Sequence, residues 1–243
     1  MGLGDAGWWA AGASVSAAAI GVGVYAAMAP GSQIFGRTLV AGRNPRELAL
    51  TFDDGPNGDT TEQLLELLAR HNVRATFFLV GRCAAAQPAL ARRIAEQGHA
   101  IGNHTMTHPH LLALGPAATR QEIVDGGKAI ADATGVEPKI FRPPFGGRWP
   151  HTLRAAQELG LTSVMWNALG FDWRETDASV IASRLLHGMR SNRTAGRATN
   201  FLLHDGSHRS LGANREATLA AVAQVLQAEA RHSRFVTVNE WID

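Results

Sequence analysis

The stretch LALTFDDGPN (residues 48–57) decides the fold and raises the question of function. It begins as an apolar, strand-like run and then places Asp53 and Asp54 side by side before a Gly-Pro turn. Two adjacent carboxylates at the end of a buried strand repel each other and lose hydration, so they need compensation nearby. The alternative is a solvated turn, which Asp-Gly-Pro also favours. The rest of the chain has to decide between the two.

Short apolar runs of this kind alternate with longer helical patterns along the chain. The apolar runs cover residues 48–52, 75–80, 100–103, 140–142, 163–167, 200–204 and 235–239. The helical patterns cover residues 61–70, 88–97, 119–134, 150–158, 177–190 and 215–230. This alternation predicts an α/β fold with parallel strands. Since roughly 200 residues is near the lower limit of an eight-stranded barrel, we expect a distorted, incomplete (β/α) barrel of about seven strands, with an open doubly wound sheet as the alternative.

Composition limits the classes of function. The chain has 243 residues, 45% of them hydrophobic, which is enough for one sizeable core and an appendage. Its formal net charge is +2, and its arginines are spread without a cluster, so we expect no nucleic-acid partner and a solvated arginine surface. Cys83 is the only cysteine, which excludes an internal disulfide.

The first 45 residues differ from the rest. Residues 6–36 carry no charge, and a helix over the apolar or small residues 8–30 would be long enough to cross a hydrocarbon core of about 30 Å. We therefore expect an N-terminal apolar transmembrane helix with a linker (1–45) and a folded domain (46–243), with a packed surface helix as the alternative. A cleaved signal peptide is disfavoured because no Lys or Arg precedes the apolar run. Arg37, Arg43 and Arg46 after the span favour a cytoplasmic domain.

Unusual polar residues follow the predicted strands. Parallel strands bring their C-terminal ends to one face, where α/β folds build their sites. We therefore expect one site formed by residues that lie far apart in the sequence. These residues are Asp53, Asp54, His104, His108, Arg142, Asp172, Trp173, His204 and Asp205, with His110 and His208 near its mouth.

His104 and His108 predict a metal site. They lie four residues apart, and Pro109 disfavours helical geometry at His108, so a loop should direct both rings to one point. With one carboxylate of Asp53 and Asp54 they supply two nitrogens and one oxygen, the ligand set of an open catalytic zinc site. Such a metal lowers the pKa of its water from 15.7 to about 7. The other carboxylate is then free to act as general base, since adjacent side chains of an extended segment point in opposite directions.

Arg142 and His204 complete the predicted site. Apolar and proline residues flank Arg142, which favours a buried guanidinium that holds the base ionised and oriented over a surface salt bridge. His204 follows Leu202 and Leu203 and should be enclosed. A carboxylate such as Asp172 would raise the pKa of His204 enough to keep it protonated as general acid. A satisfied core histidine is the alternative.

The motifs TFDDGP, HTMTH, RPPF, DW and LLHD occur in the order typical of one family. In them the chain resembles the polysaccharide deacetylases of carbohydrate esterase family four, the NodB-homology fold, over residues 46–243. The resemblance implies a distorted barrel with about seven strands and a catalytic domain that binds one divalent metal ion, zinc or cobalt. It also implies that the backbone N–H of Phe145 helps to hold the oxyanion.

The resemblance implies a role for each matching residue. Asp53 is the general base, Arg142 orients it, and Asp172 tunes the general acid His204. The metal ligands are Asp54, His104 and His108, and the substrate-binding residues are Pro144, Phe145, Trp173 and Leu202. The chain departs from the family at Leu169, where many members carry an acid, and at Phe145, where tyrosine is frequent. We expect catalysis to survive these departures and substrate contacts to differ.

These observations predict a metal-dependent hydrolase that removes N-acetyl groups from an amino-sugar polysaccharide such as peptidoglycan or chitin-type oligomers. The alternatives are an O-acetyl xylan esterase, a deformylase of a lipid-linked sugar, and a catalytically silent carbohydrate-binding protein. A silent protein would have a different residue at one or more of the positions Asp53, His104, His108 and His204, and none of these residues is replaced. The partners expected are the acetylated carbohydrate and the membrane. We expect the domain to face the cell envelope, although the arginines after the predicted span favour a cytoplasmic domain. The oligomeric state stays open. Trp149 and Trp166 are expected to be packing residues.

Overall fold

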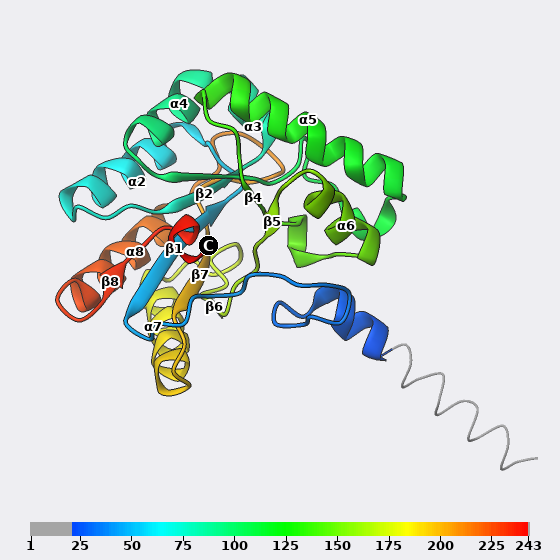
Figure 1. Cartoon of the computed structure of the whole chain (residues 1–243). Helices are drawn as coiled ribbons and strands as arrows, with labels where there is room; N and C mark the ends of the chain where they lie inside the picture. Colours follow the sequence, from blue (N-terminus) through cyan, green and yellow to red (C-terminus); the bar gives the residue numbers. More distant parts are fainter. Residues whose placement is uncertain (1–20, 243) are drawn as a thin grey trace, which may run out of the picture.

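The computed structural model describes residues 21–242, in which strands and helices alternate through most of the chain (Figure 1). The strands are β1 (Glu47–Asp53), β2 (Thr76–Leu79), β3 (Ala100–Asn103), β4 (Ile140–Phe141), β5 (Thr162–Ser163), β6 (Ala168–Leu169), β7 (Thr199–His204) and β8 (Arg234–Phe235). The α-helices are α2 (Gly58–Arg70), α3 (Gly81–Ala86), α4 (Pro88–Glu96), α5 (Pro116–Thr134), α6 (Pro150–Glu158), α7 (Ala178–Thr194) and α8 (Glu216–Glu229). Three short 3-10 turns are η1 (Leu111–Ala113), η2 (Pro144–Gly146) and η3 (Val238–Trp241). The predicted α/β class is confirmed.

The strands form one parallel sheet in the order β5-β4-β3-β2-β1-β7-β6, and β8 pairs with the start of β1. Only residues 164–167 join β5 to β6, so the two edges of the sheet lie within roughly 17 Å of each other. Leu39 lies in this gap and pairs with Val164, and its N–H donates to Ser163 O at 2.8 Å. The sheet is therefore curled into the incomplete barrel that the sequence predicts.

The helices form the outer layer. Neighbours contact one another in the series α6-α5-α4-α2-α8-α7 around the strands (Figure 1). The side chains of Leu48 and Phe52 belong to the large apolar cluster between the sheet and these helices, whereas Ala49 belongs to a smaller cluster inside the barrel. Because side chains alternate along a strand, Thr51 and Asp53 share the inward face with Ala49.

The structure differs from the predicted elements in three places. The predicted strand at residues 235–239 is shorter, because β8 ends at Phe235 and the 3-10 turn η3 begins at Val238. The single strand at residues 163–167 is wrong, because the chain crosses there from one edge of the sheet to the other and divides into β5 and β6. Within the crossing, the N–H of Asn167 donates to Asn200 O on β7 at 3.1 Å. Helix α3 was not predicted, since its six residues are too few to show a helical period.

The first residues that the structure describes, 21–28, are helical. The fully buried Arg148 holds this segment, because its guanidinium donates to the carbonyl oxygens of Ala27, Ala29 and Ser32 and to that of Gly146 in η2. A cation at these carbonyls complements the dipole at the C-terminal end of the helix.

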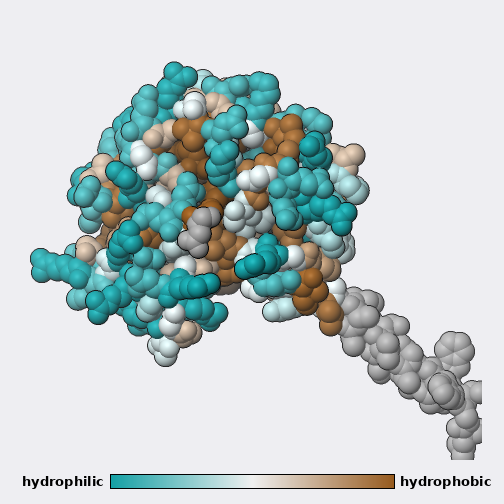
Figure 2. All heavy atoms as spheres, in the orientation of Figure 1, coloured by the Kyte–Doolittle hydropathy of each residue, from teal (hydrophilic) through white to brown (hydrophobic). Residues whose placement is uncertain are grey.

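Apolar side chains are exposed on the same segment (Figure 2). Within residues 21–242, we find no helix long and apolar enough to cross a membrane. Most of the predicted span at 8–30 falls on residues 1–20, which lie outside the described residues, so the membrane anchor stays a prediction. The exposed apolar residues are Val22, Val24, Met28 and Ile34.

Candidate active site

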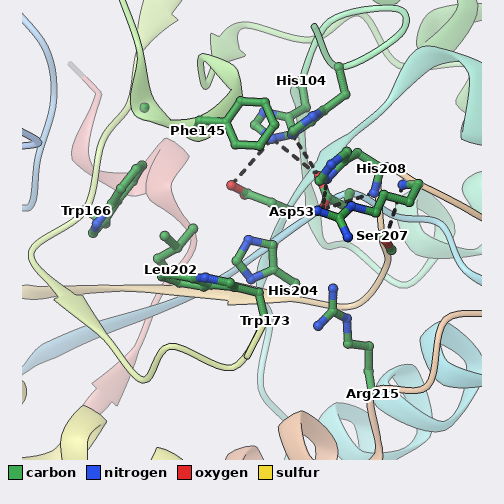
Figure 3. A pocket seen from close by; sticks show the side chains of 14 residues that line it. Asp53, His104, Phe145, Trp166, Trp173, Leu202, His204, Ser207, His208 and Arg215 are labelled. Atoms are coloured by element: carbon green, nitrogen blue, oxygen red, sulfur yellow. Dashed lines mark hydrogen bonds and ion pairs between the residues drawn. The ribbon is translucent and has the colours of Figure 1, made fainter. Parts of the chain in front are cut away.

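A cleft of about 400 Å³ opens at the C-terminal ends of the strands (Figure 3). It brings together side chains from β1, from β7 and from the segments after β3, β4 and β6. Asp53 and His204 are direct neighbours in the register of β1 and β7. Parallel α/β folds place their sites at this face, and most of the polar residues that the sequence singles out line the cleft there.

Asp53 and Asp54 both reach this site. The prediction that they point in opposite directions is wrong, because Asp54 has a left-handed backbone (φ 75°) and ends the extended run. As a result, His104 Nε2 lies 3.7 Å from Asp53 Oδ2 and 3.7 Å from Asp54 Oδ1. Left-handed backbone is uncommon for residues other than glycine, and His108 (φ 61°) and Phe145 (φ 58°) share it here. Strained backbone of this kind concentrates at functional sites.

Asp54, His104 and His108 present three donor atoms within 4.8 Å of one another. His104 Nδ1–H donates to the carbonyl of Arg142 at 2.7 Å, which leaves Nε2 as the free nitrogen. Burial lowers the pKa of His104 to about 4 against the opposing charge of Asp53, so this ring is neutral, as a metal ligand has to be.

The oxygen of this donor set lacks a hydrogen-bond donor. Asp54 Oδ1 is buried and unpaired within the described residues, although His108 Nε2 lies only 3.1 Å away. Burial would raise the pKa of Asp54, but His108 and His208 beside it hold that pKa well below its usual range. An imidazole that binds a metal has to be neutral, and in that form His108 Nε2 offers a lone pair beside Asp54 Oδ1, where a cation would stabilise both atoms. Two imidazoles and one carboxylate therefore fit a zinc-type ion with a free coordination position.

Arg142 is fully buried behind Asp53. Its Nη1 donates to Asp53 Oδ1 and to Thr51 Oγ1, both at 2.7 Å, and its guanidinium lies 4.0 Å from the ring centre of Phe78. Burial lowers the pKa of Arg142 and the charge of Asp53 opposes this, so the guanidinium stays charged. The structure thus gives Asp53 the buried cationic partner that the sequence predicts.

His204 forms the second buried ion pair. Its Nδ1 lies 2.9 Å from Asp172 Oδ1, and its backbone N–H donates to Asp172 Oδ2 at 2.8 Å. The hydroxyl of Thr218 also donates to this carboxylate, at 3.0 Å. Burial alone would lower the pKa of His204, but the charge and hydrogen bond of Asp172 raise it to about 9. The imidazole is therefore protonated at neutral pH, with Nε2–H left for a ligand in the cleft.

One side of the cleft is apolar (Figure 3). Leu202 and Trp173 line it as predicted positions for substrate contact, and Trp166 lines it too, although the sequence favoured packing for this residue. Phe145 lies 39% exposed at the rim. Pro144 is buried in η2 and is not among the lining residues.

The opposite side is polar and basic (Figure 3). It comes from the loop between β7 and α8, where Ser207, His208, Arg209 and Arg215 line the cleft. The ring of His208 stacks on that of His108, with centroids 4.5 Å apart. The predictions from the sequence did not include Ser207, Arg209 and Arg215. Ser207 and Arg209 lie within four residues of the end of the LLHD motif, which is the signal that would have found them, whereas Arg215 lies ten residues beyond it.

Asp205 does not line the cleft. It is buried beneath the Gly55 turn, and its Oδ2 accepts a hydrogen bond of 2.5 Å from the Thr61 hydroxyl. Burial raises the pKa of Asp205 to about 7. Trp149 packs as predicted, with its Nε1–H donating to Leu112 O at 3.0 Å.

A barrel whose cleft combines a carboxylate and imidazole donor set with two buried ion pairs is the architecture of a hydrolase. The polysaccharide deacetylase family model matches residues 41–164. The chain is 34% identical over 196 residues to a peptidoglycan-N-acetylglucosamine deacetylase of Bacillus cereus, which covers 80% of this chain and 68% of the relative. It is 38% identical over 162 residues to a chitooligosaccharide deacetylase of Bradyrhizobium sp., which covers 66% of this chain and 71% of the relative.

A solved structure gives the same result. The Bc1960 peptidoglycan N-acetylglucosamine deacetylase, in complex with a naphthalenyl N-oxidanyl benzamide, superposes with a TM-score of 0.76 at 31% identity, covering 84% of this chain and 92% of the other. The chain belongs to the polysaccharide deacetylase family, carbohydrate esterase family four. It is a hydrolase of that class. It spans only 38% of the length of its Listeria monocytogenes relatives.

Proposed function

We propose that this enzyme removes N-acetyl groups from an amino-sugar polysaccharide with the help of one divalent metal ion. The observation that carries the proposal is the meeting of three metal donors, a carboxylate paired with a buried arginine, and a protonated histidine around one cleft. Relatives named for peptidoglycan N-acetylglucosamine and for chitooligosaccharides support an N-acetylated glucosamine chain as the substrate.

Asp54, His104 and His108 would hold the metal, and zinc suits this donor set best. When bound, such an ion polarises the acyl carbonyl and makes water a better nucleophile near neutral pH. An ion held by these residues would lie beside the cleft that a sugar chain would enter, because all three residues line it.

Asp53 is the proposed general base. Arg142 occupies Oδ1, so Oδ2 is the oxygen left on the side of His104 to accept a proton from the attacking water. The fixed pairing with Arg142 limits the rotation of the carboxylate. The backbone N–H of Phe145 is the proposed donor to the oxyanion that develops on the acyl group.

His204 is the proposed general acid. Its Nε2–H would protonate the leaving amine nitrogen, and Asp172 on Nδ1 stabilises the imidazolium until that transfer. Leu202 and Trp173 lie on the same side of the cleft and would contact the acetyl methyl.

Acetate release from N-acetylglucosamine oligomers tests the proposal. The protein is stripped of metal and then given zinc or cobalt, and Asp53→Asn is compared with the matched exposed variant Asp132→Asn. We expect metal-restored activity that falls by about 10³-fold in Asp53→Asn and is unchanged in Asp132→Asn. Thermal unfolding with and without zinc gives a second readout, since a folded-state ligand raises the unfolding temperature.

The same assay separates the remaining activities. Release of acetate from acetylated xylan but not from the amide substrate would identify an O-acetyl esterase, and silence on both despite bound zinc would point to formylated sugars. Absence of zinc-dependent stabilisation together with absence of activity would contradict the proposal and favour a silent carbohydrate-binding protein.

A further inference from the structure

A second cavity adjoins the cleft. It has a volume of about 260 Å³ and shares Ser207 and Arg209 with the cleft, so the two are continuous at the β7–α8 loop. We name it the arginine pocket. Its lining residues are Arg82, Cys83, Ser207, Arg209, Ser210 and Leu211.

The arginine pocket contains two cations and no carboxylate. Arg82 donates to the backbone carbonyl of His208, and no side-chain hydrogen bond of Arg209 is found within residues 21–242. Arg215, on the adjoining wall of the cleft, donates to the carbonyls of Gly206 and Asp172. In the described part of the chain, none of Arg82, Arg209 and Arg215 forms an ion pair with a carboxylate.

Two cations with no carboxylate among the lining residues give this end of the cleft a positive potential, which favours an anionic ligand. A guanidinium presents parallel N–H donors that match the two oxygens of a carboxylate, and the hydroxyls of Ser207 and Ser210 can donate to the same group. Ser207 and Arg209 of the pocket flank His208 in the sequence, and the ring of His208 stacks on that of the candidate metal ligand His108. Because the arginine pocket shares Ser207 and Arg209 with the cleft, one sugar chain can reach both the pocket and the candidate metal donors.

We propose that the arginine pocket binds a carboxylate of the substrate, so that the enzyme prefers an acidic amino-sugar polymer to a neutral one. This inference rests on the proposed function, which it narrows from any N-acetylated amino-sugar chain to one that carries carboxylates. Arg209 is the residue that determines the preference, and Arg82 fixes the loop and adds its charge.

Three oligosaccharides of equal length test the pocket with the zinc-loaded full chain. One is a neutral N-acetylglucosamine oligomer, one is a peptidoglycan glycan fragment with lactyl carboxylates, and one is that fragment with its carboxylates converted to methyl esters. Arg209→Gln is compared with the exposed, unpaired Arg92→Gln as the matched control. For the native protein we expect kcat/KM to be about tenfold higher on the carboxylated fragment than on its ester, the worth of one charge-assisted hydrogen bond.

Arg209→Gln should abolish this preference, because KM should rise more on the carboxylated fragment than on its ester, which brings the two kcat/KM values together. Arg92→Gln should keep it. Equal kcat/KM of the native protein on acid and ester, or an equal loss on all three substrates in Arg209→Gln, would overturn the proposal. A stronger Arg209-dependent preference for a phosphorylated oligomer would also overturn it and assign the pocket to phosphate.

Calorimetric binding separates this proposal from the proposed function. If the native protein releases no acetate from any substrate, the proposed function fails. Tighter binding of the carboxylated fragment than of its ester, lost in Arg209→Gln, would then still support the arginine pocket. Equal binding of acid and ester would overturn it.

Discussion

Two buried arginines lie six residues apart and serve different ends. Arg142 and Arg148 are both fully shielded from solvent, and burial lowers the pKa of both. Arg142 has the carboxylate of Asp53 as its partner, whereas within residues 21–242 Arg148 donates only to backbone carbonyls, such as that of Ala29 at 2.7 Å. A buried cation always needs partners, but the kind of partner differs between these two.

One short segment therefore carries an arginine that belongs to the site and an arginine that stabilises the fold. A carboxylate partner keeps a second charge beside the reacting groups, so Arg142 belongs to the site. Carbonyl partners carry only dipoles, so Arg148 connects the helix at residues 21–28 to the η2 turn without adding a reactive group. Substitution of Arg142 should therefore lower kcat, whereas substitution of Arg148 should lower mainly the free energy of unfolding.

The largest effect on turnover should follow from Arg142→Met. Asp53 would lose its buried partner, and we expect kcat to fall by about 10³-fold, of the order that a general base contributes. The free energy of unfolding should fall by about 3 kcal/mol, because the variant leaves a buried charge uncompensated. Acetate release and urea denaturation measure the two effects, with the exposed Arg154→Met as control. A kcat within threefold of the native value would end the distinction between the two arginines.

Asp172→Asn extends the comparison to the other buried ion pair. His204 with its pKa of about 9 is protonated at neutral pH, so activity should be flat up to pH 8 and decline as the pH rises through about 9. Without the charge of Asp172, burial lowers the pKa of His204, and the alkaline decline should move below pH 7.

The expected loss of kcat in Asp172→Asn at pH 7.5 is about 10²-fold. A pH profile of kcat from 5 to 10 for native protein and variant measures the shift. An unchanged alkaline limb in the variant would show that His204 is not the titrating acid.

Thr51→Val sharpens the comparison to one hydrogen bond of Arg142. The hydroxyl accepts from Arg142 at 2.7 Å and donates to Phe201 O at 2.6 Å. Its removal should lower kcat by about tenfold, since Arg142 keeps Asp53 but loses a second anchor. Thr76→Val is the matched control, because Thr76 pairs with Thr51 in the register and bonds only the N–H of Val238. Equal loss of kcat in both variants would assign the effect to packing of the barrel.

The smallest effect on turnover should come from Arg148→Met. We expect the free energy of unfolding to fall by about 2–4 kcal/mol, because several buried carbonyls lose a charged donor. Acetate release at a temperature where the variant is folded should stay within about threefold of the native value. Differential scanning calorimetry measures the stability of the variant, and kinetics on the same sample measure its kcat. A loss of kcat as large as that of Arg142→Met would contradict a purely structural role of Arg148.

The sequence predicts the buried arginine beside Asp53 but not the one that holds the N-terminal segment. Arg142 could be placed beside Asp53 because apolar and proline residues flank it, and because two adjacent carboxylates at a strand end need a cation nearby. The expectation of solvated arginines is wrong for Arg148, whose partners are carbonyls that every residue carries. No side-chain pattern can therefore mark such a position in advance.

Other features of the site depended on local backbone geometry. The α/β alternation and the curled sheet follow from hydrophobic periodicity and length, and both are confirmed. The shared orientation of Asp53 and Asp54 depends on one dihedral angle at Asp54, which periodicity does not report. The position of Trp166 in the cleft likewise results from the crossing at residues 164–167, which reads from the sequence as a plain strand.

The register of β1 and β7 also affects the order of events in folding. Thr51 bonds to Phe201 across a sequence separation of 150 residues, and the same pairing places Asp53 opposite His204. At a synthesis rate of about 5–20 residues per second, β7 follows β1 from the ribosome only after roughly 8–30 s. A nascent chain thus possesses Asp53, both histidines of the HTMTH motif and Arg142 well before it possesses His204. The groups proposed as base and acid become neighbours only when this long-range pairing forms, so β1 needs protection of one edge until synthesis is nearly complete.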